Sequence, residues 1–216
     1  MTTASDLSTI AATPCFLNGH TLPLNEANIS VMDRGFIFGD GVYEVLSVYD
    51  NTVFRFEQHM QRLERSLAEM RIPNPHTRDE WLAIANDLLH HANTPMCANH
   101  LIYVQITRGV AMRDHVMPDN ITPTVFVMVS AMRMPSDAQR ASGVACVSAS
   151  DFRWEKAHIK STSLLGAVFS RQISADAGAL ETVMFRGEHL SAAAASNVWL
   201  AKNSVVLVPP KDHMVH

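Results

Sequence analysis

Hydrophobic and polar positions in the first part of the chain follow two different periods. Three apolar runs have the length and composition of β-strands: 16–22, 42–49 and 52–56. Asn18-Gly19 interrupts the first run and Asp50-Asn51 separates the other two, and both dipeptides favour tight turns. Apolar residues then recur at every third or fourth position, at Phe56, Met60, Leu63, Leu67 and Met70. This pattern predicts two β-hairpins and a helix with one buried face, which ends before Pro73.

A second helix and further strands are predicted beyond this proline. Thr77 and Glu80 have the spacing of a capping box at the start of a helix. The apolar face of that helix comprises Trp81, Ile84 and Leu88. Runs rich in β-formers lie at 100–107 and 124–131, and the second is nearly all apolar, as expected of a buried strand. The remaining elements predicted are a strand near 143–149, a helix near 163–177 that Gly178 caps, and strands at 181–185, 197–201 and 205–208.

A change of composition at 133–137 indicates an interdomain linker, because a proline and small polar residues there separate two patterned regions. We therefore expect a flexible tail at 1–13, a small N-terminal α/β domain at 14–132 and a second domain at 138–216. Together the elements predict a two-domain protein of the α/β or α+β class.

Composition narrows the class of protein further. Of the 216 residues, 47% are hydrophobic and 18% are charged, which is typical of a soluble globular protein. The net charge of −4 gives no electrostatic footprint for nucleic acid, and no apolar run approaches the roughly 20 residues that cross a bilayer. The cysteines are Cys15, Cys97 and Cys146. Their wide spacing predicts neither a disulfide framework nor a metal site, and it fits a cytoplasmic location.

The segment 32–45 is the most informative chemical feature of the sequence. It places Gly35, Gly39 and Gly41 beside acidic residues, an arginine and Tyr43. Glycines at this density indicate a backbone that turns sharply or approaches another group closely. Because a strand is predicted from residue 42, Tyr43 is presented from the end of a rigid element. Taken alone, such a segment is equally typical of a glycine-rich turn with a buried tyrosine.

A lysine with potential chemistry lies at position 160, just before the predicted helix at 163–177. It begins the run Lys160-Ser161-x-x-Leu164-Leu165-Gly166. A lysine amine becomes a nucleophile when burial or a neighbouring cation lowers its pKa. An ordinary surface lysine is the alternative, and Lys156 is a nearby competitor that lacks the run that follows.

Several motifs, in their order along the chain, resemble those of class IV aminotransferases, the fold-type IV enzymes that depend on pyridoxal 5′-phosphate (PLP). They are the glycine-rich segment, Arg62, Arg113-x-His115, Lys160 and Ser196-Asn197-Val198. The resemblance extends from about residue 16 to residue 216 and is greatest to the D-amino-acid aminotransferases. It implies a smaller N-terminal α/β sandwich and a larger, mixed β-barrel-like domain that binds PLP, of which 138–216 would be an incomplete part.

The resemblance also implies a cofactor site. Lys160 corresponds to the lysine that forms a Schiff base with PLP and moves a proton during the reaction. Arg62 corresponds to a bidentate clamp on the PLP phosphate, and His59 lies three residues earlier, where it could hold that arginine in place. Ser196, Asn197 and the residue at position 192 correspond to the strand that lies against the cofactor.

For the substrate, the resemblance implies that Tyr43, Arg113 and His115 bind the α-carboxylate of a D-amino acid, with a 2-oxo acid as the amine acceptor. Residues two apart in an extended backbone point the same way, so Arg113 and His115 can converge on one anion. In the family this loop enters the active site of the partner subunit, which implies a homodimer with shared active sites. Arg108 is the nearest alternative clamp.

Two features depart from the family pattern. Ala192 stands where the family has a glutamate that protonates the pyridine nitrogen, and Ala193 replaces a glycine. The cofactor should therefore withdraw electrons less strongly, and Glu181 is the nearest acidic residue in the sequence. The chain also ends where the family has a glycine-threonine phosphate loop, so we expect the second domain to be incomplete at its C-terminus.

These departures leave alternatives open. A branched-chain L-amino-acid aminotransferase and an aminodeoxychorismate lyase share the fold. An inactive PLP-binding protein or an interaction module is the alternative from another class, and Ala192 supports it.

Overall fold

The computed structural model describes residues 13–91, 99–153, 156 and 158–209, and the predicted tail at 1–13 lies outside them except for Thr13. The chain divides into two compact units. The first comprises Met1–Arg133 together with Ile159–Thr162, and the second comprises Met134–His158 and Ser163–His216. The short segment around Lys160 therefore belongs to the N-terminal unit, although it lies well beyond the predicted linker in sequence.

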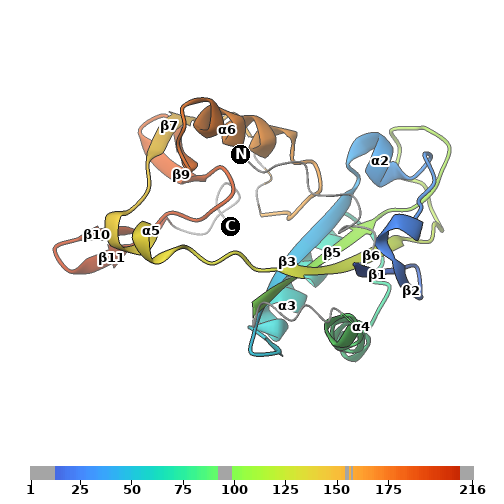
Figure 1. Cartoon of the computed structure of the whole chain (residues 1–216). Coiled ribbons are helices and arrows are strands. Elements are labelled where there is room, and N and C mark those ends of the chain that lie inside the picture. The colour runs from blue at the N-terminus through green and yellow to red at the C-terminus, as the bar shows by residue number, and fades with distance from the viewer. Residues whose placement is uncertain (1–12, 92–98, 154–155, 157, 210–216) are drawn as a thin grey trace. The chain divides into compact units, whose positions relative to one another are not determined.

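A six-stranded antiparallel sheet forms the frame of the first unit (Figure 1). Its strands are β1 (Pro14–Leu17), β2 (His20–Pro23), β3 (Gly41–Tyr49), β4 (Thr52–Val53), β5 (Asn99–Thr107) and β6 (Thr124–Ala131), in the order β2-β1-β6-β5-β3-β4. Both predicted hairpins are confirmed, with Asn18 and Asn51 at positive φ in the turns. Strand β4 is shorter than expected because Arg55 adopts a positive φ and the next helix begins at once.

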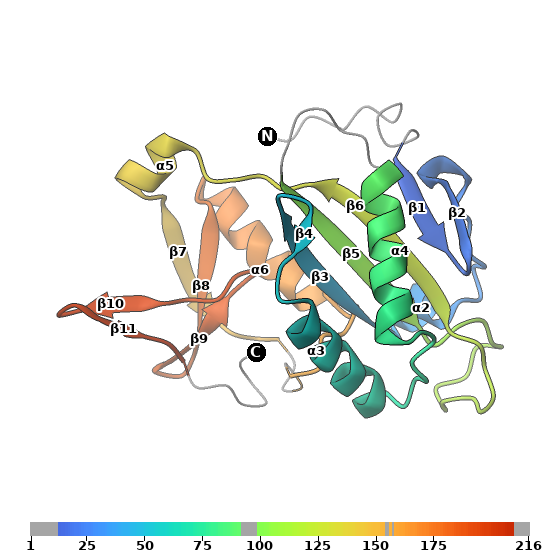
Figure 2. The same cartoon turned by 90° about the horizontal axis from the view of Figure 1, so that it is seen from below.

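Two long helices cover one face of this sheet (Figure 2). They are α3 (Phe56–Glu69) and α4 (Arg78–His91), and both were predicted from the apolar period. The capping box before α4 is confirmed: Thr77 N donates to Glu80 Oε2 at 2.7 Å, and Glu80 N donates to Thr77 Oγ1 at 3.3 Å. A short 3-10 helix, η1 (Leu24–Glu26), follows β2.

The core lies between this face and the two helices. Alternate residues of the three central strands point into it: Val42, Leu46 and Val48 from β3, Ile102, Val104 and Ile106 from β5, and Val125, Val127 and Val129 from β6. Helix α3 contributes Met60, Leu63 and Leu67. Glu44 occupies the same row of β3 and is fully buried, so this carboxylate requires polar partners inside the core.

The glycine-rich segment is a short helix rather than a turn. Helix α2 (Arg34–Phe38) begins at Asp33, whose side chain accepts a hydrogen bond from Gly35 N at 2.7 Å, and ends at Gly39 with φ 66°. The sequence pattern missed it because five residues are too few to show a helical period.

The second unit contains two small sheets and two helices. Its elements are α5 (Asp137–Ser142), β7 (Cys146–Ser150), α6 (Leu165–Asp176), β8 (Glu181–Arg186), β9 (His189–Ala193), β10 (Leu200–Lys202) and β11 (Val205–Leu207). Strands β7, β8 and β9 form one sheet, in which β7 and β8 are parallel, and β10 pairs with β11. Helix α5 and strand β9 were not predicted. Helix α5 begins inside the expected linker because Ser136 and Gln139 form a capping box.

The two units together give a mixed α/β fold. Within the described residues, no helix has the length and apolar character that a membrane span requires.

Candidate functional site

The backbone of Lys160 is held at the edge of the large sheet by residues distant in sequence. Tyr43 N donates to Lys160 O at 2.9 Å, and Thr162 N donates to Gly41 O at 3.0 Å, so residues 160–162 extend the sheet beside the start of β3. On the other side, Lys160 N donates to Ser66 Oγ at 3.3 Å. Gly41 lies between this segment and β5, where a Cβ would be 2.7 Å from the carbonyl oxygen of Ile106 and 3.3 Å from Thr162 Oγ1, so a glycine is required there.

The side chain of Lys160 lies over an aromatic surface. Its Nζ is 4.1 Å from the ring centre of Tyr43, and that ring stacks on Tyr103 with a centroid separation of 5.8 Å. The Tyr103 hydroxyl donates to Gln105 Oε1 at 2.7 Å, and burial, reinforced by Tyr43, raises the pKa of Tyr103 to about 12. In the part of the chain that the structure describes, no carboxylate pairs with Lys160. The amine is therefore not engaged in an ion pair with any described residue.

A buried carboxylate, not foreseen from the sequence, orients Arg62. Glu44 Oε1 accepts a hydrogen bond from Arg62 Nε at 2.5 Å, and Glu44 Oε2 accepts one from Arg62 Nη2 at 2.7 Å. His59 Nδ1 lies 2.9 Å from Glu44 Oε2 and 3.3 Å from Arg62 Nη2, so His59 contacts both partners. Burial on its own would raise the pKa of Glu44, but the hydrogen bonds from Arg62 and His59 outweigh burial and lower it.

This arrangement changes the expected role of Arg62. The Nε–Nη2 edge, which would give a bidentate grip on phosphate, is engaged by Glu44. Among the described residues, Arg62 Nη1 has no partner, and about a third of the side chain is exposed. Arg62 can therefore offer an anion the donors of Nη1 while Glu44 fixes the plane of the guanidinium. A charged residue in the apolar row of β3 was the signal in the sequence that could have identified Glu44.

Arg113 and His115 come together on a loop that packs against α2. The guanidinium carbon of Arg113 is 5.4 Å from the ring centre of Phe38, and the His115 ring is 5.5 Å from it. Both side chains are exposed to solvent, although they lie beside the Phe38 ring. Within the described residues, neither forms a hydrogen bond or ring contact with Tyr43.

Arg108 is not an alternative anion clamp. Its side chain is 2% exposed, and it donates to both carboxylate oxygens of Asp40, at 2.8 and 3.0 Å. It also donates to the carbonyl oxygens of Met70 and Arg71 at 2.7 and 3.1 Å. A guanidinium with these partners has no donor edge open to a substrate.

The second unit contains the other residues that the sequence identified. Ala192 is half-buried in β9, and Ser196 and Asn197 are exposed after it. Ser196 Oγ donates to Glu181 Oε2 at 2.9 Å, so Glu181 lies beside one of these residues. Lys156 is exposed in the same unit.

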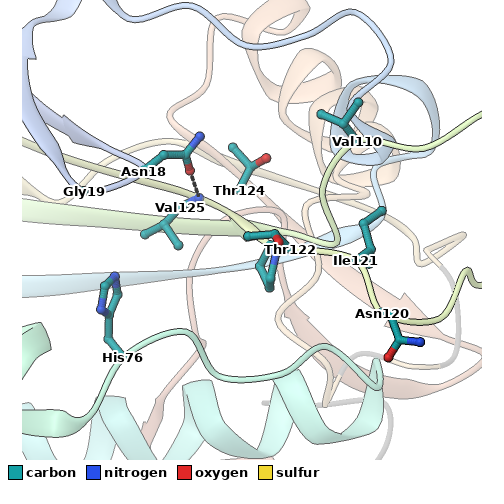
Figure 3. A pocket seen from close by; sticks show the side chains of 10 residues that line it. Asn18, Gly19, His76, Val110, Asn120, Ile121, Thr122, Thr124 and Val125 are labelled. Atoms are coloured by element: carbon teal, nitrogen blue, oxygen red, sulfur yellow. Dashed lines mark hydrogen bonds between the residues drawn. The ribbon is translucent and has the colours of Figure 1, made fainter.

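A groove in the first unit lies elsewhere. It has a volume of about 650 Å³ and is lined by Asn18, His76, Asn120 and Thr122 among others (Figure 3). Its described lining includes none of the site residues predicted from the sequence. We therefore do not assign it to the same chemistry.

The donor set of the first unit fits PLP. It offers an amine without an ion pair among the described residues, a partly exposed guanidinium for a phosphate and an aromatic surface beside the amine. In the second unit, the run 192–195 consists of alanines and carries no polar side chain.

Comparisons with known proteins agree on one family. Residues 41–215 match the family model described as amino-transferase class IV. The chain is similar to the D-alanine aminotransferase of Staphylococcus haemolyticus, with 33% identity over 204 residues, which cover 94% of this chain and 71% of that protein.

Solved structures of similar fold have lower sequence identity. The branched-chain amino acid aminotransferase of Escherichia coli has a TM-score of 0.79 and 22% identity, over 92% of this chain and 68% of that one. The PLP-bound form of a hypothetical aminotransferase from Mycobacterium tuberculosis has a TM-score of 0.75 and 21% identity, over 91% and 71% of the two chains.

Proposed function

This chain belongs to the class IV aminotransferase family, and from that premise we propose that it transfers the amine of a D-amino acid to a 2-oxo acid with PLP as cofactor. D-alanine and 2-oxoglutarate represent the substrate type. The observation that carries the proposal is the placement of Lys160: its backbone is fixed at the sheet edge by Tyr43 and Ser66, and its amine lies over the Tyr43 ring.

In the proposed reaction each residue has a separate task. PLP, when bound, supplies the electron-withdrawing group that makes the α-hydrogen of an amino acid acidic. Lys160 Nζ would hold the cofactor, and as a free amine it would remove the α-hydrogen of the substrate as a general base. Arg62 Nη1 binds the phosphate, held in orientation by Glu44. Ser196 and Asn197 are proposed as further residues that would bind the cofactor.

Substrate binding is proposed for Tyr43, Arg113 and His115, which would hold the α-carboxylate. Once the carboxylate is fixed, only one enantiomer directs its α-hydrogen toward Lys160. The relative with 33% identity is named a D-alanine aminotransferase, whereas the branched-chain enzyme of similar fold has 22% identity, which shows the fold alone. The D enantiomer is therefore favoured over the L enantiomer.

The test of this assignment is a stereochemical assay. With 2-oxoglutarate as acceptor, D-alanine should be converted on the order of 100-fold faster than L-leucine, because a misplaced α-hydrogen costs about that factor. Formation of pyruvate and of the 2-oxo acid of leucine measures the two rates. Turnover confined to L-leucine would replace our assignment with the branched-chain activity.

We further propose a homodimer in which the Arg113–His115 loop completes the site of the partner subunit. The loop and its surroundings expose large apolar side chains, with Met112 84%, Val116 72% and Phe36 69% exposed. Apolar side chains at this exposure on adjoining segments are typical of an interaction surface.

Subunit mixing tests the shared site. Lys160→Ala and Arg113→Ala chains, each inactive alone, should regain about a quarter of the wild-type activity when co-expressed. The reason is that half of the dimers are mixed and each mixed dimer has one intact site of two. If every site is built within one subunit, mixed dimers contain no intact site and no activity returns.

One observation favours a second candidate, a PLP-binding protein without transaminase activity. The alanines at 192–195 provide no acid for the pyridine nitrogen. Such a protein would show the visible absorption band of bound PLP but no change in this band on addition of D-alanine.

A further inference from the structure

The loop that carries Arg113 and His115 is fastened to α2. In Figure 1 the loop after β5 lies beside α2, and two backbone hydrogen bonds join them: Arg34 N donates to Gly109 O at 2.9 Å, and Ala111 N donates to Met32 O at 3.3 Å. These bonds fix the start of the loop. They do not reach the two residues proposed to bind a carboxylate.

A side chain extends this attachment to the middle of the loop. Arg34 is 4% exposed, and its Nη1 donates to the backbone oxygen of Asp114 at 2.6 Å. That oxygen belongs to the peptide between Asp114 and His115, and Arg113 precedes it directly. Because a peptide unit is planar, fixing this oxygen restricts the backbone on both sides of it.

Asp40 sets the direction of the Arg34 guanidinium. Its Oδ2 accepts hydrogen bonds from Arg34 Nε at 2.7 Å and Arg108 Nε at 2.8 Å. Burial alone would raise the pKa of Asp40, but the hydrogen bonds from both arginines outweigh it and lower the pKa, so the carboxylate stays ionised. Arg108 also donates to Met70 O just beyond the C-terminus of α3, the helix that carries Arg62. A continuous series of hydrogen bonds therefore runs from α3 to the loop.

Phe38 provides a second constraint from the same helix. Its ring centre lies 4.8 Å from the guanidinium carbon of Arg34, 5.4 Å from that of Arg113 and 5.5 Å from the His115 ring. Cations over an aromatic face are attracted by its quadrupole. The Phe38 ring thus contacts both Arg113 and His115.

We propose that Arg34 and Phe38 are positioning residues that set the geometry of Arg113 and His115, and with it the affinity for a small carboxylate. The inference rests on the proposed function in taking Arg113 and His115 as the carboxylate ligands. The glycine-rich segment at 32–45 then holds this loop in place, in addition to presenting Tyr43. The segment acts through backbone placement, since Arg34 is buried and its Nε and Nη1 donate to Asp40 and to the backbone of Asp114.

Arg34→Lys is the decisive substitution. Lysine keeps the charge next to Asp40, but a single ammonium on a flexible stem does not reproduce the two directed bonds of a planar guanidinium. Amide hydrogen exchange in the segment 109–118 should become at least about tenfold faster, while exchange in β5 stays unchanged. Arg65→Lys, an exposed position on α3, is the matched control. Equal loop exchange in the Arg34 and Arg65 variants would overturn the inference, and this measurement requires no bound cofactor.

Binding of a small carboxylate tests whether the position of the loop sets the affinity of the site. In protein loaded with PLP, the dissociation constant of propanoate, followed by cofactor absorbance, should rise about tenfold in Arg34→Lys. Arg113→Ala should produce at least as large a rise, and the double variant should add little to it, because both act on one interaction. Unchanged propanoate binding in Arg34→Lys together with weakened binding in Arg113→Ala would overturn the positioning role and leave the carboxylate site intact. Unchanged binding in both variants would overturn the carboxylate site and the positioning role together.

A second variant keeps the test valid if Arg34→Lys does not fold. Phe38 is half-buried, and Phe38→Leu removes the ring but retains an apolar side chain. It should weaken propanoate binding about threefold or more without altering exchange in β5, because each cation–ring attraction that the substitution removes is modest. Wild-type affinity in this variant would contradict the role assigned to Phe38.

Discussion

Lys160→Ala is expected to abolish covalent attachment of PLP and to reduce transamination by at least about 10³- to 10⁴-fold, because the amine acts both as nucleophile and as general base. Borohydride reduction of the PLP-loaded protein followed by peptide mass analysis measures the first effect. The wild-type protein should carry a pyridoxyl group on the peptide that contains Lys160, and the variant should carry none. The rate of the reaction with D-alanine measures the second effect.

The chain provides a matched control for this experiment. Lys156 is four residues away, is exposed, and belongs to the second unit, so Lys156→Ala should retain both the adduct and the activity. Folding should survive in both variants, since the Lys160 amine lies against the Tyr43 ring and forms no ion pair with any described residue. An adduct that persists in Lys160→Ala and disappears in Lys156→Ala would assign the chemistry to the other lysine.

Glu44→Gln should weaken PLP binding by about ten- to a hundredfold, although Glu44 is not proposed to touch the cofactor. The carboxylate is fully buried and accepts two hydrogen bonds from Arg62 and one from His59. Glutamine removes the charge and directs an NH₂ group at these donors, so Arg62 is no longer fixed. A charge-assisted hydrogen bond contributes about 1.5–3 kcal/mol, which corresponds to the affinity change expected.

The same variant should lose stability. Removing one partner of a buried ion pair costs about 3–5 kcal/mol, and we expect the lower part of this range because about a third of Arg62 is exposed to solvent. Denaturant unfolding of the protein without PLP isolates this effect from cofactor binding. Glu64→Gln is the control, since Glu64 on α3 pairs at the surface with Arg78 of α4 and its replacement should change stability by less than about 1 kcal/mol. If Glu44→Gln binds PLP normally, Arg62 does not depend on Glu44 for its orientation.

The elements that sequence patterning predicted correctly are those encoded by near neighbours. Helix α3 follows from apolar residues repeated along one stretch, and the start of α4 follows from Thr77 and Glu80, three residues apart. The β1–β2 and β3–β4 hairpins follow from the turn residues between their strands. Where the local signal was short, as at α2 and α5, or weak, as at β9, the prediction missed the element.

In the candidate site, too, the sequence predicted some features and missed others. The motifs identified Lys160, Arg62, Arg113 and His115 as residues, but of the groups that hold them only His59, which lies three residues from Arg62 and contacts it. Glu44 and Arg62 are 18 residues apart, Arg34 and Asp114 are 80 apart, and Lys160 and Ser66 are 94 apart. No periodicity connects positions at such separations. The expected alternative clamp, Arg108, was excluded only by its burial against Asp40.

The amino-acid sequence alone therefore determined the long helices, the hairpins and the family, because each of these depends on side chains within a few positions or on a recognisable run of residues, and it supplied the reactive residues that we propose. The tertiary structure decided which carboxylate orients Arg62, that α2 anchors the loop bearing Arg113 and His115, and that residues 159–162 belong to the N-terminal unit. These features depend on contacts that exist only after distant strands pair and the buried charges find partners within hydrogen-bonding distance.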